Sequence, residues 1–379
     1  MGEFRRGRPY GALEKENGVK GGSRRRARGA ALALVLGLGL GLVLELAAGP
    51  AAGVDGAAPA AVTGAAAVAG AVPPAPTPDP AAPGELRVMT FNIRYGTALD
   101  GENAWEKRRE LLGETIRALR PDVLGTQECL AGQAEFLRTA LPGYGCVGVG
   151  RDDGKLAGEM CAIFYREDRF RLLAEGHFWL SETPEVVGSR GWDAALPRLV
   201  SWVRLRARDD TMRTLVCFDT HFDHVGEAAR LASAQLLRER AQAVAGGAPA
   251  IVLGDFNAPA DAGRPGPYAA LLGRAQEAQE VGEAEEAEER LALRDVYRQL
   301  HAPQPDEGTF HGFTGRRDGE RIDWILATPD WVPLAAAIDR TGRDGRWPSD
   351  HFPVTAVLRW PAALTTTPRP RPRRRGCAA

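Results

Sequence analysis

Short apolar segments alternate with longer amphipathic segments across the middle of the chain. The apolar segments predict strands at 86–92, 123–128, 160–166, 199–205, 214–222, 250–257, 321–327 and 352–360. The amphipathic segments 105–119, 133–141 and 227–244 predict helices, because their apolar side chains recur at helical spacing. Many of the strands are apolar on both faces, so we expect sheets that are covered on both sides. The pattern therefore predicts one α/β domain over residues 85–360.

Polar side chains occur at the ends of these apolar strands. In an α/β structure, strand ends project side chains into the crevice where ligands bind. The polar residues are Asn92, Glu128, His221, Asp255, Asn257, Asp323, Asp350 and His351. Each alone has an ordinary structural explanation; an Asp-x-Asn after a strand, for example, commonly forms a turn. Together they supply hard oxygen ligands, two imidazoles and amides suited to phosphate oxygens.

The segments around these positions resemble the endonuclease/exonuclease/phosphatase superfamily. TFNIR (90–94), QE (127–128), TH (220–221), GDFN (254–257), RIDWI (321–325) and SDHFPV (349–354) occur in the family's order. The chain is most similar to an exported bacterial branch nearest the deadenylase-like members. The resemblance implies an α/β fold of four layers, α/β/β/α, in which two packed mixed sheets are flanked by helices. It also implies a hydrolase of phosphate esters.

The resemblance implies a divalent cation, Mg²⁺ or Mn²⁺, which binds carboxylate oxygen and keeps several waters. Glu128 is then the principal ligand, and Asp350 and Asn92 assist it directly or through water. No zinc site is expected, because the five cysteines lack CxxC or CxxH spacing. Cys161 and Cys217 lie in apolar strands and are expected to be buried free thiols.

The resemblance also implies the remaining roles in the site. Asp255 would orient and deprotonate the attacking water, and Asn257 would hold that water or the phosphate. His351 would donate a hydrogen bond to a phosphoryl oxygen, with Asp323 fixing its tautomer and raising its pKa. His221 would bind the same phosphate or protonate the leaving group. The sequence leaves open which of His221, His351 and Asp255 transfers the proton.

Residues that contact the substrate are predicted from the segments 101–109, 178–184, 191–198 and 308–313, which distinguish this subgroup. Trp192 and Arg198 are expected at an aromatic and cationic rim, and His311 is a candidate contact. His224 follows His221 at a spacing that suggests a metal. Two histidines without a third ligand make a poor zinc site, so a hydrogen-bonding role for His224 is favoured.

The charge of the chain bears on its substrate. The formal net charge is −1, but residues 85–360 carry about 34 basic and about 43 acidic side chains, a balance of about −9. Long nucleic acid binds largely through Lys and Arg, so this balance favours a small, sugar- or lipid-linked phosphate mono- or diester. The alternative is an extracellular nuclease (an endonuclease or a 3′–5′ exonuclease). A non-catalytic binding module would have lost at least one of the positions above.

The flanking segments predict export. In residues 1–53, a cluster of arginines (24–26 and 28) precedes the apolar stretch 29–44, as in a secretory signal or an uncleaved membrane anchor. Residues 54–84 are rich in Ala and Pro and predict a flexible tether. Residues 274–292 form an acidic insertion, and 361–379 a basic tail. We therefore expect a secreted or extracytoplasmic monomer, in contact with the membrane where the apolar segment is retained.

Overall fold

The computed structural model describes residues 84–209, 213–261, 263–273 and 291–361. The predicted signal segment, tether, acidic insertion and basic tail lie almost wholly outside these residues. None of the helices described is long and apolar enough to cross a membrane.

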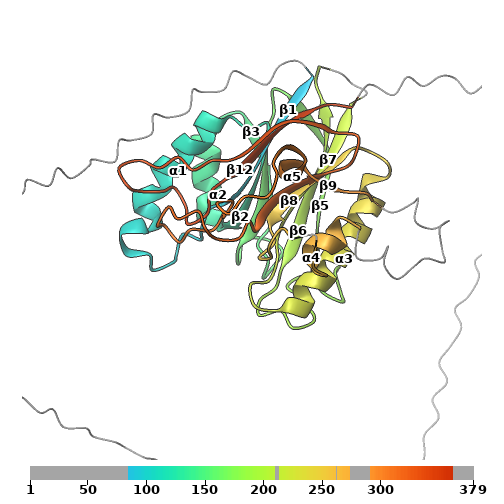
Figure 1. Cartoon of the computed structure of the whole chain (residues 1–379), viewed down its shortest axis with the longest axis horizontal. Helices are drawn as coiled ribbons and strands as arrows, with labels where there is room; N and C mark the ends of the chain where they lie inside the picture. The colour runs from blue at the N-terminus through green and yellow to red at the C-terminus, as the bar shows by residue number, and fades with distance from the viewer. Residues whose placement is uncertain (1–83, 210–212, 262, 274–290, 362–379) are drawn as a thin grey trace, which may run out of the picture. The chain divides into compact units, whose positions relative to one another are not determined.

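Two sheets of six strands each form the centre of the domain (Figure 1). The first has the order β11 (Val332–Ile338), β12 (Val354–Arg359), β1 (Glu85–Asn92), β2 (Val123–Cys129), β4 (Met160–Arg166) and β3 (Tyr144–Val147). The second has the order β5 (Phe170–Trp179), β6 (Leu199–Ala207), β7 (Thr214–His221), β8 (Ala250–Asp255), β10 (Asp323–Ala327) and β9 (Arg294–Asp295). Both sheets are mixed, since β1–β2 and β7–β8 pair in parallel and the other neighbours are antiparallel.

Helices α1 (Trp105–Leu119) and α2 (Ala131–Ala140) cover the outer face of the first sheet, and α3 (Glu227–Ala245) and α4 (Pro267–Leu271) that of the second (Figure 1). The short helix α5 (Val296–Leu300) packs instead on the cluster between the sheets through Val296, and a 3₁₀ turn lies at Gly101–Asn103. Helix α1 buries Trp105, Leu112 and Ile116 at helical spacing. It ends at Arg120, which is left-handed, and Pro121 follows, which cannot continue the helix.

Three apolar clusters separate the layers. Leu86 and Val88 of β1 point into the cluster between the sheets, whereas Met89 and Phe91 point into the cluster beneath α1 and α2. A third cluster packs α3 and α4 against the outer face of the second sheet. This alternation along buried strands produces four layers and confirms the predicted sandwich.

The eight predicted strands and three predicted helices are all present, with ends shifted by a few residues at most. The pattern missed β3, β5, β9 and β11 and the helices α4 and α5. Strand β5 alternates buried and exposed positions, and β11 is a largely exposed edge strand that begins near Pro333. Strand β9 has two residues, and α4 and α5 have five each, too few to produce a periodic signal.

Strand pairing brings the polar strand ends to one edge. Asn92 of β1 is the register partner of Gln127 in β2, and His221 of β7 is the partner of Asp255 in β8. Asp255 is also the register partner of Asp323 in β10. The ends of these strands therefore meet across the two packed sheets.

Candidate active site

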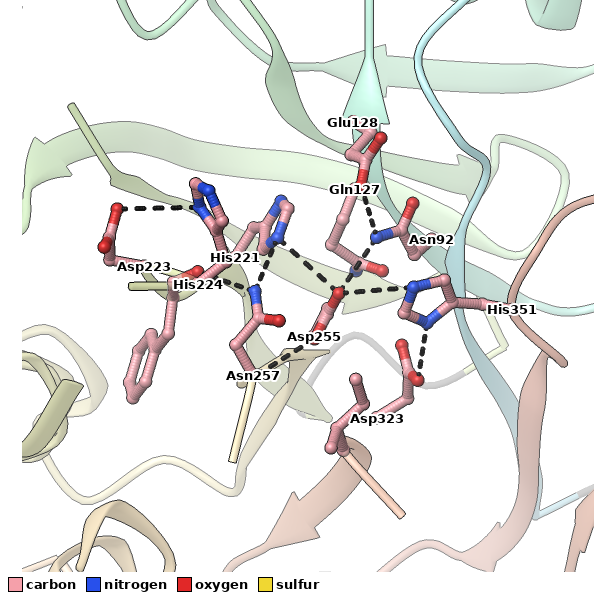
Figure 2. Close-up of polar contacts among 12 residues, drawn as sticks. Asn92, Gln127, Glu128, His221, Asp223, His224, Asp255, Asn257, Asp323 and His351 are labelled. Carbon is pink, nitrogen blue, oxygen red and sulfur yellow. Dashed lines mark hydrogen bonds and ion pairs between the residues drawn. The ribbon is translucent and has the colours of Figure 1, made fainter. Parts of the chain in front are cut away.

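Asn92 joins the two sheets at the centre of the site (Figure 2). Its Nδ2 donates to Glu128 Oε1 at 3.0 Å and to Asp255 Oδ2 at 2.9 Å, and the side chain is fully buried. One amide thus holds a carboxylate of the first sheet and a carboxylate of the second at fixed positions. Backbone N–H of Arg94 donates to Asn92 Oδ1 at 3.0 Å, which fixes the orientation of the amide.

His351 lies between two buried carboxylates. Its Nδ1 is 2.9 Å from Asp323 Oδ2, and its Nε2 is 3.8 Å from Asp255 Oδ2. Burial alone would lower the pKa of His351, but the carboxylates of Asp323 and Asp255 raise it to about 10. The ring is therefore an imidazolium that can donate a hydrogen bond. Burial, together with the charge of Asp323, raises the pKa of Asp255 to about 7.

His221 lies on the other side of Asp255. Its Nε2 is 3.0 Å from Asn257 Nδ2 and 3.5 Å from Asp255 Oδ2. Burial, and then the positive charges of Arg198 and Arg151, hold the pKa of His221 well below its usual value. The ring is thus neutral, and Nε2 accepts the hydrogen bond that the Asn257 amide donates. The two histidines flank one carboxylate in opposite protonation states.

Glu159 is a site residue that the sequence reasoning missed. Its Oε2 accepts from Arg151 Nη1 at 2.6 Å and lies 3.9 Å from His221 Nδ1, on the side of the ring away from Asp255. Burial raises the pKa of Glu159. The sequence pattern identifies polar residues that end strands. Glu159 instead directly precedes β4, which begins at Met160. Met160 of β4 is the register partner of Cys129 at the end of β2, so the start of this strand also reaches the site.

Glu128 and Asp350 offer carboxylates to a metal. Glu128 has a left-handed backbone (φ 57°) at a register shift that ends β2, and its Oε2 accepts from Tyr95 N at 3.0 Å. Asp350 accepts from Ser349 Oγ at 3.2 Å. Burial raises the pKa of Asp350, and the negative charge of Glu128 adds to this effect. Two neighbouring carboxylates and an amide oxygen fit a hard cation such as Mg²⁺ or Mn²⁺.

A second group of potential ligands is formed by Asp255, Asp323 and His351, whose ligand atoms lie within 4.8 Å of one another. The ligand set that the family resemblance predicts, Glu128 with Asp350 and Asn92, lies beside this group, since Asn92 Nδ2 donates to both Glu128 and Asp255. The described residues thus offer a metal two neighbouring groups of ligands.

Arg198 lies next to this centre and is buried. Its Nε donates to Asp223 Oδ2 at 3.4 Å, its Nη2 is 2.9 Å from His224 Nδ1, and its Nη1 has no hydrogen-bond partner. Arg198 lines a small cavity with Glu128, Arg151, Glu159 and His221. A buried guanidinium with a free N–H beside the metal ligands is suited to binding a phosphate oxygen.

Asp223 and His224 lie near His221 in the loop after β7 (Figure 2). Both contact Arg198. Burial raises the pKa of Asp223, but hydrogen bonds from the backbone N–H groups of Gly226, Ala195 and Val225 lower it to about 2. The carboxylate therefore stays charged beside Arg198. His224 is about half exposed, in keeping with the predicted hydrogen-bonding role rather than a zinc site.

Trp192 and His311 occupy different surroundings from each other. Trp192 is partly exposed, and its backbone, left-handed at φ 52°, donates to Glu182 Oε1 at 3.0 Å. His311 is buried and stacks on Phe352 at 3.9 Å, and burial lowers its pKa to about 4. The substrate contacts assigned to these two residues stay predictions.

The comparisons with known proteins concern the family and the fold. A model of the Endonuclease/Exonuclease/phosphatase family matches residues 89–351. A mannosyl-6-phosphatase from Bacteroides thetaiotaomicron is 34% identical, with a TM-score of 0.62, and the match covers 72% of this chain and 99% of that one. An endonuclease/exonuclease/phosphatase from Bacteroides vulgatus is also 34% identical, with a TM-score of 0.63, covering 73% and 99%.

The fold is also similar to that of the human Nocturnin catalytic domain, solved with a bound sulfate anion. This match is 20% identical, has a TM-score of 0.53 and covers 73% of this chain and 93% of that one. At this identity the likeness concerns the fold alone.

Proposed function

The chain belongs to the endonuclease/exonuclease/phosphatase family of metal-dependent hydrolases, and from that premise we propose that it is an exported phosphatase of small sugar-linked phosphate esters. That it hydrolyses phosphoester bonds follows from the family. The sugar-linked substrate and the export are the proposal. The observation that supports phosphoester hydrolysis at this site is the meeting of Asn92, Asp255 and His351 at one edge of the two sheets, and the similarity to a mannosyl-6-phosphatase carries the sugar-linked substrate.

The site residues divide into those that hold a metal and those that hold protons. Glu128 and Asp350, with Asn92, would hold Mg²⁺ or Mn²⁺, which when bound supplies Lewis-acid polarisation of a phosphoryl oxygen. Asp255 Oδ2 faces both histidines and would take the proton of the attacking water. Asn257 would hold that water through its Oδ1, because its Nδ2 hydrogens are donated to His221 Nε2 and Phe222 O.

The two histidines would act on the phosphate in different ways. His351 carries a proton on each nitrogen and would donate a hydrogen bond to the phosphoryl oxygen while Asp323 fixes its ring. His221, neutral between Asp255 and Glu159, would bind the phosphate as a hydrogen-bond donor, since a neutral imidazole is too weak an acid to protonate the leaving oxygen. Arg198 would supply a charged N–H to a second phosphate oxygen.

Two observations support a sugar phosphate. The similar Bacteroides thetaiotaomicron protein is a mannosyl-6-phosphatase and is matched over 99% of its length. The acidic balance of residues 85–360 disfavours long nucleic acid, whose binding requires many cationic contacts. A lipid-linked phosphate fits the same site chemistry, and an extracellular nuclease is the alternative activity.

A hydrolysis panel on the purified chain tests the proposal. The substrates are mannose 6-phosphate, glucose 6-phosphate, a short-chain phosphatidic acid, bis(p-nitrophenyl) phosphate and a single-stranded oligonucleotide, each with Mg²⁺ and with Mn²⁺. We expect phosphate release from the sugar phosphates, abolished by EDTA. Preferential cleavage of the oligonucleotide would establish the nuclease instead, and preference for the phosphatidic acid would establish the lipid phosphatase.

Export is supported by the arginine cluster, the apolar stretch 29–44 and the small residues after it. Expression with cell fractionation, followed by mass spectrometry of the mature N-terminus, tests this part of the proposal. A processed form outside the cytoplasm is expected for a cleaved signal, and an intact form in the membrane fraction for an anchor. An intact form in the cytoplasm would contradict export.

A further inference from the structure

Arg108 connects the segments next to Asn92 and Asp350, two of the three proposed metal ligands. It lies in α1 and is 3% exposed. The segment 101–109 that contains it distinguished the subgroup in the sequence, but no part of the mechanism above uses it. A buried cation is costly unless it is fully hydrogen-bonded, so its partners are informative.

All the hydrogen bonds of the Arg108 guanidinium go to backbone carbonyls. Nη1 donates to Ile93 O at 2.7 Å and to Pro348 O at 2.9 Å. Nη2 donates to Arg94 O at 2.8 Å, and Nε donates to Asn103 O at 2.9 Å. One side chain therefore joins the loop after β1 to a segment about 250 residues further along the chain.

These two segments carry proposed ligands at neighbouring strands of the first sheet, because β1 pairs with β12. Ile93 follows Asn92, and Pro348 precedes Asp350 by two residues. Ser349 Oγ makes a second connection, because its one hydroxyl proton is shared between Asn92 O at 2.7 Å and Asp350 Oδ1 at 3.2 Å. The guanidinium and the hydroxyl together fix the distance between Asn92 and Asp350.

We infer that Arg108 is a positioning residue that sets the spacing of Asn92 and Asp350 and thereby the affinity of the site for a divalent cation. The inference rests on the proposed function, which places the cation at these residues. Arg108 contacts neither the cation nor the substrate. It acts through the backbone of the two loops, as outer residues around metal ligands commonly do.

The chemistry of the position requires arginine. A guanidinium presents five N–H donors in a planar fork, whereas lysine offers three donors at one point and cannot reach four separated carbonyls. The rings of Trp105 and Phe313 lie 5.2 and 5.6 Å from the guanidinium carbon and surround it with aromatic groups. Burial lowers the pKa of Arg108 to about 10, against the opposing charges of Asp350 and Asp100, so the group stays protonated at neutral pH.

The test is to measure Mn²⁺ binding to the full chain without substrate, with electron paramagnetic resonance as the readout. Arg108→Lys and Arg108→Gln should raise the dissociation constant for Mn²⁺ by about tenfold or more. This is the usual scale for residues that hold metal ligands in place without binding the metal. Arg109→Lys is the matched control, since the neighbouring arginine is 45% exposed in its side chain, and it should bind as the wild type does. Glu128→Ala should abolish Mn²⁺ binding if the metal site itself is correctly placed.

The outcomes separate this inference from the proposed function. Unchanged Mn²⁺ binding in Glu128→Ala would show that the metal site is wrongly placed, whatever Arg108 does. If Glu128→Ala loses the ion, and the folded Arg108 variants bind it within twofold of the wild type, the positioning role is overturned. Failure of both Arg108 variants to fold also overturns it, because Arg108 would then hold the fold rather than the site.

Discussion

Asp323 opposes Asp255 in the antiparallel register of β10 and β8, and both carboxylates are buried beside His351. The register leaves no freedom in their separation, so each carboxylate changes the protonation of the other and of the ring between them. This relationship gives one site both an imidazolium that donates a hydrogen bond and a carboxylate that accepts a proton.

Replacing Asp323 with Asn should separate these roles. The amide keeps the volume but removes the largest of the charges that raise the pKa of His351, so the ring holds less firmly the proton it donates to the phosphate. We expect kcat on the preferred phosphate ester to fall by at least about 10²-fold with a melting temperature close to that of the wild type. A variant that keeps more than half of the wild-type kcat would show that the pairing has no catalytic consequence.

The partly buried side chain of His177 in β5 should make the stability of the protein depend on pH. Its Nδ1 is 3.0 Å from Ser201 Oγ, and burial lowers its pKa to about 4, below the usual value of 6.5. The unfolded chain therefore binds this proton more readily, so the contribution is fully present above pH 6.5 and is lost as the pH falls through 4. Urea unfolding between pH 7 and pH 4 should show a smaller decline for His177→Gln than for the wild type. Identical declines would mean that His177 titrates normally.

Arg198 should govern substrate binding. Arg198→Lys keeps the positive charge but loses the planar guanidinium. In the wild type this group donates to Asp223 through Nε and keeps an N–H on Nη1 without a partner. We expect KM to rise by about tenfold, the scale of one lost charge-assisted hydrogen bond of about 1.4 kcal/mol. The expected effect on kcat is smaller. Arg230→Lys, which alters a nearby arginine bonded to Asp223 O, is the control and should leave KM unchanged.

Gly125 is a position where the packing of the two sheets is tested directly. An added Cβ would lie 2.0 Å from Leu253 Cδ1 and 2.7 Å from the Asp219 carboxyl, both in the second sheet. Gly125→Ala should therefore lower the free energy of unfolding by about 1–3 kcal/mol, as overpacking typically does. Gly132→Ala is the control, because the added Cβ meets nothing within 4 Å and the residue lies in α2. Equal stability of the two variants in urea unfolding would contradict the close approach of the sheets.

The residues that the sequence identified are those that end long buried strands. Asp255 and Asp323 could be identified because each follows or begins an apolar run, and the family motifs supplied their order. Their contact could not be derived, since it depends on the register between β8 and β10. Glu159 was missed because it precedes its strand, and its contact with His221 depends on the pairing of β2 with β4 and on the packing of that sheet against the sheet that contains β7.

The burial of Arg108 in helix α1 could not be predicted from the sequence either. The pattern identified 105–119 as a helix and placed its apolar side chains in the core, but arginine is usually a surface residue. Its burial arises from carbonyls of two loops that are distant in sequence, a contact that no local pattern contains.

The measurement that tests the account most directly is phosphate release from mannose 6-phosphate by the wild type and by Asp255→Asn, in Mg²⁺ and at equal folded concentration. Asp255 lies within 4 Å of both histidines and accepts from Asn92, so its carboxylate is the group the whole site surrounds. We expect metal-dependent release of phosphate by the wild type and a loss of at least about 10²-fold in kcat for Asp255→Asn. Equal rates for the two proteins would contradict the central role of the Asp255 carboxylate.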